Sequence, residues 1–230
     1  MDTDDVSSVG EYIQKLDEFK EVLMAAEARE GQLPRDRKSA GEIIMRHEMG
    51  LLERNVQQLM PHRAQHMIHS SIVAAPYLPS IASLDILKPI YIKDLRIGIH
   101  HRGTYLIIRS LTEPKRITAV MAVVEDENRD AISLQLYHQL DENIRPDSSI
   151  IAKGDVLLIK EPFFKLMSDG EYGLRVDHVS DVMRIDARHK LWPKGWIPLH
   201  KFSPSKTANE WKEKGNADMG RKHHWAAVER

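Results

Sequence analysis

The chain has 230 residues, of which 42% are hydrophobic and 29% are charged, and its formal net charge at pH 7 is −1. This composition is typical of a globular protein with a real core, and the near-zero charge excludes a chain-wide attraction to nucleic acid or anionic membranes. The chain contains no cysteine, which excludes disulfides, thiolate metal sites and cysteine nucleophiles.

The N-terminal sequence begins Met1-Asp-Thr-Asp-Asp5 and lacks the basic and apolar regions of a secretory signal peptide. No apolar run approaches the roughly 20 residues that a membrane-spanning helix requires. We therefore expect an intracellular protein, in the cytoplasm or the nucleus, with no membrane association.

Residues 1–80 are predicted to form a helical leader followed by a linker. Apolar residues recur at three- to four-residue spacing from about residue 7, and Gly31 and Pro34 end that pattern. A second helical pattern follows Ser39 and stops at Pro61.

A shorter helix is expected from about residue 62 to residue 75, and it contains three histidines. His62, His66 and His69 lie at i, i+4 and i+7, so a helix would place them on one face, a spacing that can build a metal site. No obvious supporting carboxylate lies nearby in the sequence, and surface or capping histidines are the favoured interpretation. We therefore predict no metal and no cofactor.

Residues 84–186 change to the two-residue period of β-strands. Strands are expected at 103–109, 116–125, 131–138, 155–160 and 172–177. A three-strand meander, a longer connection and two further strands are the order of the OB-fold, a small five-stranded Greek-key barrel. A two-layer β-sandwich would use similar strands. The predicted fold class is α+β, with a helical N-terminal leader, a five-stranded OB-like β-barrel and C-terminal helices.

An OB-like barrel raises the question of nucleic acid, because such barrels often bind single strands by aromatic stacking in a basic groove. The candidates for this alternative are Tyr105, Arg109, Tyr137 and Arg175. The region from Val123 to Asp130 is strongly acidic, however, and we interpret Glu125-Asp126-Glu127 as a solvated acidic tip. We therefore do not expect nucleic acid as a partner, and single-strand binding remains the alternative function.

No catalytic residues are predicted. Ser168-Asp169 and Asp177-His178 are adjacent pairs, but the chain has no nucleophile elbow, phosphate-binding glycine loop or dinucleotide fingerprint.

Residues 187–207 are an aromatic, turn-rich connector, and residues 208–230 begin one helix near Ala208 and another near residue 224. This last stretch is similar to the first repeat of a tetratricopeptide (TPR) array. Gly215 matches the signature glycine, Trp211 the early apolar position and Ala227 the small position of the second helix. Asp218 replaces the usual aromatic residue, and the later positions do not exist, so a truncated repeat is expected.

The segment Lys212-Glu-Lys-Gly-Asn216 also resembles the TPR subclass that clamps the C-terminal carboxylates of heat-shock chaperones. The resemblance implies that Lys212 and Asn216 bind a peptide carboxylate, and the i, i+4 spacing would place both on one helix face. Ordinary solvated residues are the competing interpretation. Protein or peptide partners are expected, including chaperone tails bound by a complete array.

Four segments of the barrel region resemble fungal proteins that combine TPR repeats with a SET methyltransferase-like domain: His100–Gly103, Val123–Glu127, Ile159–Lys165 and Asp169–His178. The resemblance implies a region that precedes the repeats and the SET domain. The SET cofactor-binding and catalytic motifs are not recognisable in this chain. We therefore expect a non-catalytic protein–protein interaction region, a fragment of a longer protein and not an enzyme. The further alternative is an accessory region of a protein methyltransferase.

Overall fold

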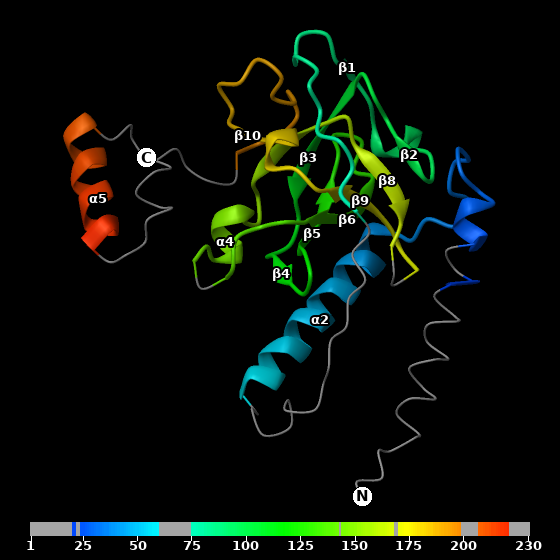
Figure 1. Ribbon diagram of the computed structural model, residues 1–230, viewed down its shortest axis with the longest axis horizontal. Helices are drawn as coiled ribbons and strands as arrows, with labels where there is room; N and C mark the ends of the chain where they lie inside the picture. The colour runs from blue at the N-terminus through cyan, green and yellow to red at the C-terminus, as the bar shows by residue number, and fades with distance from the viewer. Residues whose placement is uncertain are drawn as a thin grey trace, which may run out of the picture.

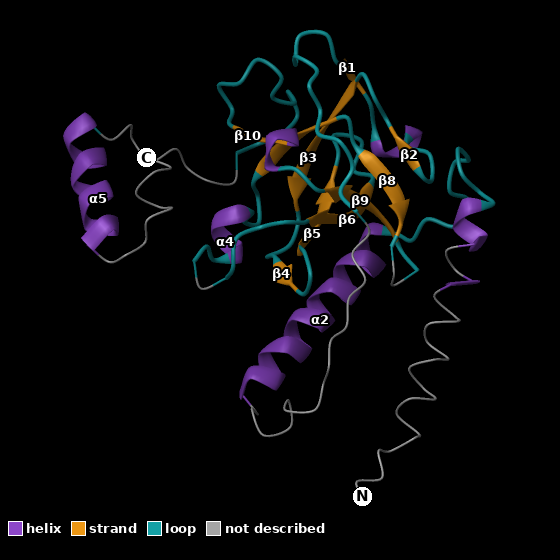
Figure 2. Cartoon of the chain, in the orientation of Figure 1, coloured by secondary structure: helices purple, strands orange, loops and turns teal. Residues whose placement is uncertain are grey.

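The computed structural model describes residues 20–21, 24–59, 75–142, 144–167, 170–198 and 207–220. The strands gather into one body, with helix α2 along its underside in the view of Figures 1 and 2. None of the described helices is long and apolar enough to cross a membrane.

Ten strands form one mixed sheet. They are β1 (Lys88–Pro89), β2 (Ile99–His100), β3 (Thr104–Ser110), β4 (Lys115–Arg116), β5 (Val120–Glu125), β6 (Ala131–Leu136), β7 (Val156–Lys160), β8 (Phe163–Leu166), β9 (Tyr172–Val176) and β10 (Val182–Ile185). The helical elements include α2 (Ala40–Leu59), α4 (Asp147–Ile150), α5 (Ala208–Gly220) and the 3₁₀ turns η1 (Ile92–Asp94) and η2 (Val179–Asp181), and residues 24–27 are helical as well.

The sheet closes on itself because one strand is bent. Strands β7 and β8 are separated only by Glu161, which has a φ of 48°, and Pro162. Before the bend the chain pairs with β3, and after it the chain pairs with β9. Strand β3 also pairs with β5, β5 with β6, and β6 with β9 in parallel. This closed ring has the strand order of an OB-like barrel and not of two stacked sheets.

The barrel core follows from the alternation of apolar residues. On β3, Leu106 and Ile108 are fully buried, while Tyr105, Ile107 and Arg109 point to the outside. A second, smaller apolar layer lies outside the barrel, where Val156, Leu158 and Ile185 pack against Trp196.

Helix α2 lies against the outer face of β5 and β6. A capping box starts it: the Ser39 backbone N–H donates to Glu42 at 2.9 Å, and the Glu42 N–H donates to Ser39 Oγ at 3.3 Å. Two side chains tie it to the β3–β5 connection. His47 Nε2 donates to the Glu113 carbonyl at 2.8 Å, and Arg54 donates to the Arg116 carbonyl at 2.6 Å.

The predicted C-terminal TPR helices are wrong. The described C-terminal residues form one helix, α5, which a second capping box begins, with Thr207 Oγ1 accepting from the Glu210 N–H at 3.3 Å. This helix runs through Gly215 and Asn216 to Gly220. The expected second helix near residue 224 lies outside the described residues. Within the part of the chain that is described, the fold is mainly β and contains no helical array.

The barrel prediction also undercounted the strands. Strands β1, β2, β4 and β10 are two to four residues long and supplement the ring of longer strands. Their pairing partners are distant in sequence or lie across a tight turn, and no periodicity develops in so few residues.

Candidate functional site

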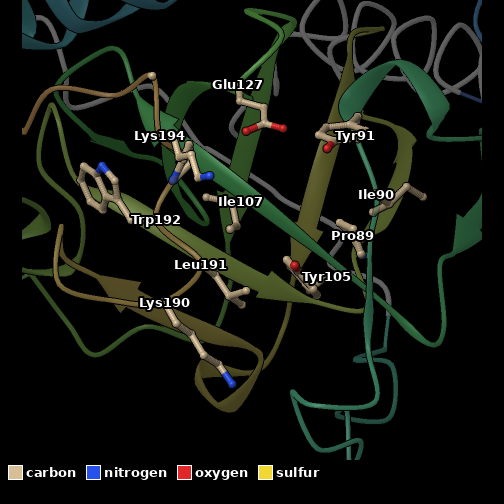
Figure 3. Close-up of a pocket in the computed structure, with 12 residues that line it drawn as sticks. Pro89, Ile90, Tyr91, Tyr105, Ile107, Glu127, Lys190, Leu191, Trp192 and Lys194 are labelled. Carbon is tan, nitrogen blue, oxygen red and sulfur yellow. The ribbon is translucent and has the colours of Figure 1, made fainter.

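A pocket of about 430 Å³ lies on the outer side of β3. Figure 3 shows Tyr105 and Ile107 of β3 between two bordering segments. One is the segment that follows β10, residues 190–195, and the other is Pro89–Tyr91, which runs beside β3 through the parallel β1–β3 pair.

The chemistry of this aromatic–lysine pocket is specific. It is lined by three aromatic side chains, Tyr91, Tyr105 and Trp192, and by two exposed lysines, Lys190 and Lys194. Aromatic faces stack on flat ring systems, and lysine ammonium groups attract phosphates. The combination suits a ligand with a planar ring and a negative charge.

The wall that carries Trp192 is held by a network of contacts around a second tryptophan. The indole N–H of Trp192 donates to the Trp196 carbonyl at 3.1 Å, and the two rings meet edge to face at 6.5 Å. Trp196 is only 9% exposed, and the guanidinium of Arg109 lies 4.9 Å from its ring centre. Arg109 is in turn paired with Glu125. The pocket wall is therefore fixed to β3 and β5.

Of the three carboxylates interpreted as a solvated acidic tip, Glu127 is exposed, but Glu125 and Asp126 are buried, contrary to the sequence interpretation. Glu125 neutralises Arg109, and Asp126 is fully buried. Of this turn, Glu127 is the residue that lines the pocket, and hydrogen bonding to its carboxylate raises the pKa of Tyr91. Burial raises the pKa of Tyr105. Both tyrosines are therefore neutral at physiological pH. The O–H of Tyr91 is directed to Glu127, whereas Tyr105 can donate a hydrogen bond to a ligand.

The face of an OB barrel that generally binds oligonucleotides, the second and third strands and their flanking loops, is covered in this chain. Here that face is β5 and β6, and helix α2 lies on it. The space that remains is about 40 Å³. Lys38 and Arg46 close it at one side by pairing with Glu171, in the connection between β8 and β9. A ligand site is therefore expected elsewhere. A pocket of about 240 Å³ lies beside Arg145 and Arg184, and the larger pocket beside β3 is the one of the two that is lined by aromatic side chains.

The four predicted nucleic-acid residues are not brought together. Tyr105 lines the pocket, and Arg109 lies on the same outer face of β3 but is engaged by Glu125 and Trp196. Arg175 lies elsewhere, on β9, with its guanidinium 5.0 Å from the ring centre of Tyr137. Its Nε donates to the buried Asp177 at 2.8 Å. Of the four, Tyr105 is the residue available to a ligand in this pocket.

The remaining predicted sites fall in the C-terminal helix and the N-terminal linker. Lys212 and Asn216 are exposed on α5, at the i, i+4 spacing that the prediction assumed. The histidines His62, His66 and His69 lie outside the described residues. Among the residues that are described, no group of three metal-ligating side chains is close enough to hold an ion.

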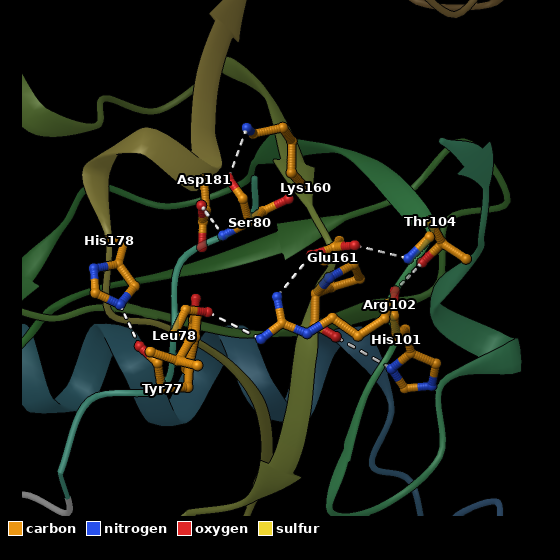
Figure 4. Close-up of polar contacts among 12 residues, drawn as sticks. Tyr77, Leu78, Ser80, His101, Arg102, Thr104, Lys160, Glu161, His178 and Asp181 are labelled. Carbon is orange, nitrogen blue, oxygen red and sulfur yellow. Dashed lines mark hydrogen bonds and ion pairs between the residues drawn. The ribbon is translucent and has the colours of Figure 1, made fainter. Parts of the chain in front are cut away.

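A second polar cluster surrounds the segment 75–81, which crosses the barrel next to η2 (Figure 4). Arg102 pairs with Glu161 at 2.7 Å and donates to the Leu78 carbonyl at 2.9 Å. The Ser80 N–H donates to the fully buried Asp181 at 3.0 Å. These contacts hold the segment in place and explain the cluster as structural.

Sequence reasoning missed most of the pocket. It treated residues 187–207 as a connector, whereas Lys190-Leu-Trp-Pro-Lys194 forms one wall. An aromatic residue flanked by two lysines was the available signal. The sequence around Tyr91 and Glu127 carries no such signal, because the β1–β3 pairing and the turn after β5 bring these residues to the pocket from distant parts of the chain.

No protein-family model matches the chain. The chain is similar to a protein named Methyltransferase from Gibberella zeae, with 38% identity over 198 residues. The match covers 86% of this chain and 24% of that protein, so the chain spans about a quarter of its relative.

Solved structures give weaker likenesses. An OB domain from Methanosarcina mazei is 13% identical, with a TM-score of 0.32 over 43% of this chain and 84% of that one. Fission yeast Pot1, in a crystal structure with single-stranded DNA, is 14% identical, with a TM-score of 0.29 over 38% of this chain and 37% of that one. At these scores the likeness says nothing of what this chain binds.

These findings correct three predictions. The relative is named as a methyltransferase, so the prediction that the chain is not an enzyme is withdrawn. No family model supports TPR repeats or a SET domain, so those assignments, with the chaperone-tail partner that depended on them, are not kept. The prediction against nucleic acid is also withdrawn, because two of the acidic side chains on which it rested, Glu125 and Asp126, are buried, and Glu125 is paired with Arg109.

Proposed function

We propose that this chain is a region of a methyltransferase and that it binds single-stranded nucleic acid at the aromatic–lysine pocket beside β3. The observation that carries the binding function is the pocket itself, where Tyr105 and Trp192 offer aromatic faces beside Lys190 and Lys194. The methyltransferase assignment is supported by the 38% identity to the Gibberella zeae protein.

The pocket suits a strand better than a duplex. A base can stack on Tyr105 or Trp192 only if its face is accessible, which duplex stacking prevents. The two exposed lysines belong to the same wall as Trp192, where a phosphate on either side of a stacked base can meet them. The neutral Tyr105 adds a hydrogen-bond donor without adding negative charge.

The binding function is tested by fluorescence anisotropy with labelled single-stranded DNA and RNA of about 8–16 nucleotides. Trp192→Ala and Tyr105→Ala should each weaken binding roughly 5- to 150-fold, because stacking contributes about 1–3 kcal/mol per base. Replacing both Lys190 and Lys194 with Gln should reduce the salt slope by about 1.4, since each phosphate contact to a single strand contributes about 0.7.

Two matched controls make the test specific. Tyr137→Phe changes a tyrosine outside the pocket, and Lys212→Gln removes an exposed lysine from α5. Both should bind as the unmodified chain does. Absence of binding to DNA and RNA at micromolar concentration would exclude the function, as would equal losses in the pocket variants and the controls.

The methyltransferase assignment has a separate test. The aligned region of the Gibberella zeae protein can be replaced by this chain. The chimera should transfer a labelled methyl group as the parent does, whereas a chimera with an unrelated barrel should not. A chimera that folds but is inactive would argue against the assignment and would leave the binding result unaffected.

A further inference from the structure

Helix α2 has two opposite faces, and only one is used by the barrel. The face toward β5 and β6 carries Ile43, His47, Gly50 and Arg54, which are buried or half-buried. Because an α-helix turns by about 100° per residue, a second line of side chains lies on the side of α2 opposite to these residues. That line is the outer stripe of α2: Met45 (59% exposed), Met49 (55%), Leu52 (64%) and Val56 (46%).

The outer stripe has the spacing of a helix-pairing seam. Its members follow one another at intervals of four, three and four residues, which is the a/d spacing of a two-helix coiled coil. A helix that faces water on this side would carry polar residues there. Four large apolar side chains in one line over three turns indicate a face that another helix covers.

We propose that the outer stripe binds the outer stripe of a second copy of this chain in an antiparallel two-helix contact. Under two-fold symmetry the stripe is complementary to itself. Met45 of each copy packs opposite Val56 of the other copy, and Met49 packs opposite Leu52. No additional partner is needed to cover all four side chains.

The charges beside the stripe select the antiparallel orientation. Antiparallel pairing places Arg46 of one copy next to Glu53 of the other, twice by symmetry. Parallel pairing places Glu48 next to Glu53 of the second copy, which is repulsive. All three charged residues are exposed. Arg46 also pairs with Glu171, which Lys38 shares, and its side chain is still 55% exposed.

The contact is small, so the dimer is weak. Residues 45–56 cover about 17 Å of helix. A contact of one short helix pair lies at the small end of protein–protein interfaces, below about 1,200 Å², where weak and transient associations are found. The inference does not rest on nucleic-acid binding, because α2 covers β5 and β6, whereas the pocket lies beside β3.

Sedimentation equilibrium over a range of concentrations tests the proposal. The full chain should show a monomer–dimer equilibrium, and Met49→Glu or Leu52→Glu should shift it at least tenfold toward monomer. Ile81→Glu is the matched control, since Ile81 is 99% exposed and lies outside α2. Equal thermal unfolding midpoints of the variants would show that the helix is still folded against the barrel.

A charge reversal tests the orientation. Glu53→Lys places a lysine beside Arg46 of the second copy in the antiparallel arrangement, so the dimer should weaken. In a parallel arrangement the same lysine would face Glu48 and the dimer would tighten, which would overturn the proposal. A chain that is monomeric at all concentrations, or a dimer unaffected by Leu52→Glu, would overturn it as well.

Discussion

Asp126 organises the turn after β5 through three backbone amides. Its Oδ2 accepts from the Ile92 N–H at 2.8 Å, and its Oδ1 accepts from the Asn128 and Asp130 N–H groups at 2.9 and 3.2 Å. Burial raises the pKa of this carboxyl group. The residue therefore connects the turn that carries Glu127 to the segment that carries Tyr91, and so shapes one side of the pocket.

We expect Asp126→Ala to lower the free energy of unfolding by about 3 kcal/mol, because it leaves buried N–H groups without acceptors. Asp126→Asn should lower the free energy of unfolding by less, since its carbonyl oxygen can still accept from the backbone N–H groups of Asn128 and Asp130. The adjacent Glu127→Ala is the control and should change stability by less than about 0.5 kcal/mol. Urea unfolding measures all three, and similar losses for the 126 and 127 variants would contradict the assignment.

At the scale of single residues, sequence pattern predicts burial of apolar side chains better than it predicts the fate of charged ones. Alternation along β6 correctly predicts that Ile132 and Leu134 lie on the face turned to the core, where both are buried. The sequence interpretation of Asp126 as a solvated residue was wrong, because its three donors come from backbone that is placed only when the barrel closes. No local pattern reports such a partner.

The strands and α2 show which elements local sequence specifies. The five predicted strands correspond to β3, β5, β6, β7 and β9, because each is long enough to alternate. The bend between β7 and β8 was missed. Glu161 has a positive φ and accepts from the Gly103 N–H at 2.9 Å, a contact between residues 58 apart.

The attachment of α2 is expected to depend on pH through His47. Burial lowers the pKa of His47, which is 5% exposed. The fold therefore prefers the neutral ring. The stabilisation is complete above the unfolded pKa of about 6.5 and is lost as pH falls through the lower folded pKa.

The midpoint of thermal unfolding should fall as the pH is lowered from about 7.5 to about 5.5. Burial also lowers the pKa of His100 and of His101, so these two histidines contribute in the same direction as His47. His47→Gln retains an N–H donor for the Glu113 carbonyl and cannot take up a proton, so its midpoint should fall less. The same pH dependence in this variant would show that His47 does not carry the effect.

At the scale of the whole molecule, segments that precede the barrel in sequence are part of its wall. The Gly31 N–H donates to the Ile97 carbonyl at 2.8 Å, and Arg37 donates to the Ile92 carbonyl at 2.8 Å. Further along, the Tyr77 N–H donates to Asp177 at 3.1 Å. The domain boundary at residue 84 remains a prediction. Because these contacts join residues before 84 to the barrel, the stability of shortened chains tests it.

We expect a chain of residues 31–198 to unfold cooperatively, with a midpoint close to that of the full chain. A chain of residues 84–198 should be less stable by several degrees or should not fold, because the buried Asp177 and Asp181 lose their backbone donors. Circular dichroism on heating compares the two. Equal midpoints would place the boundary at 84, as the sequence predicted.

The order in which the barrel closes has a consequence for synthesis on the ribosome. Leu106 pairs with Ile159, and β6 pairs with β9, so the ring cannot close until the chain has been made beyond residue 176. Helix α2 emerges before every strand that it covers. Its capping box allows it to form early, and the side that packs on the barrel then stays in solvent until β5 and β6 have been made. We expect this interval, and not the finished barrel, to be the step most prone to aggregation during expression.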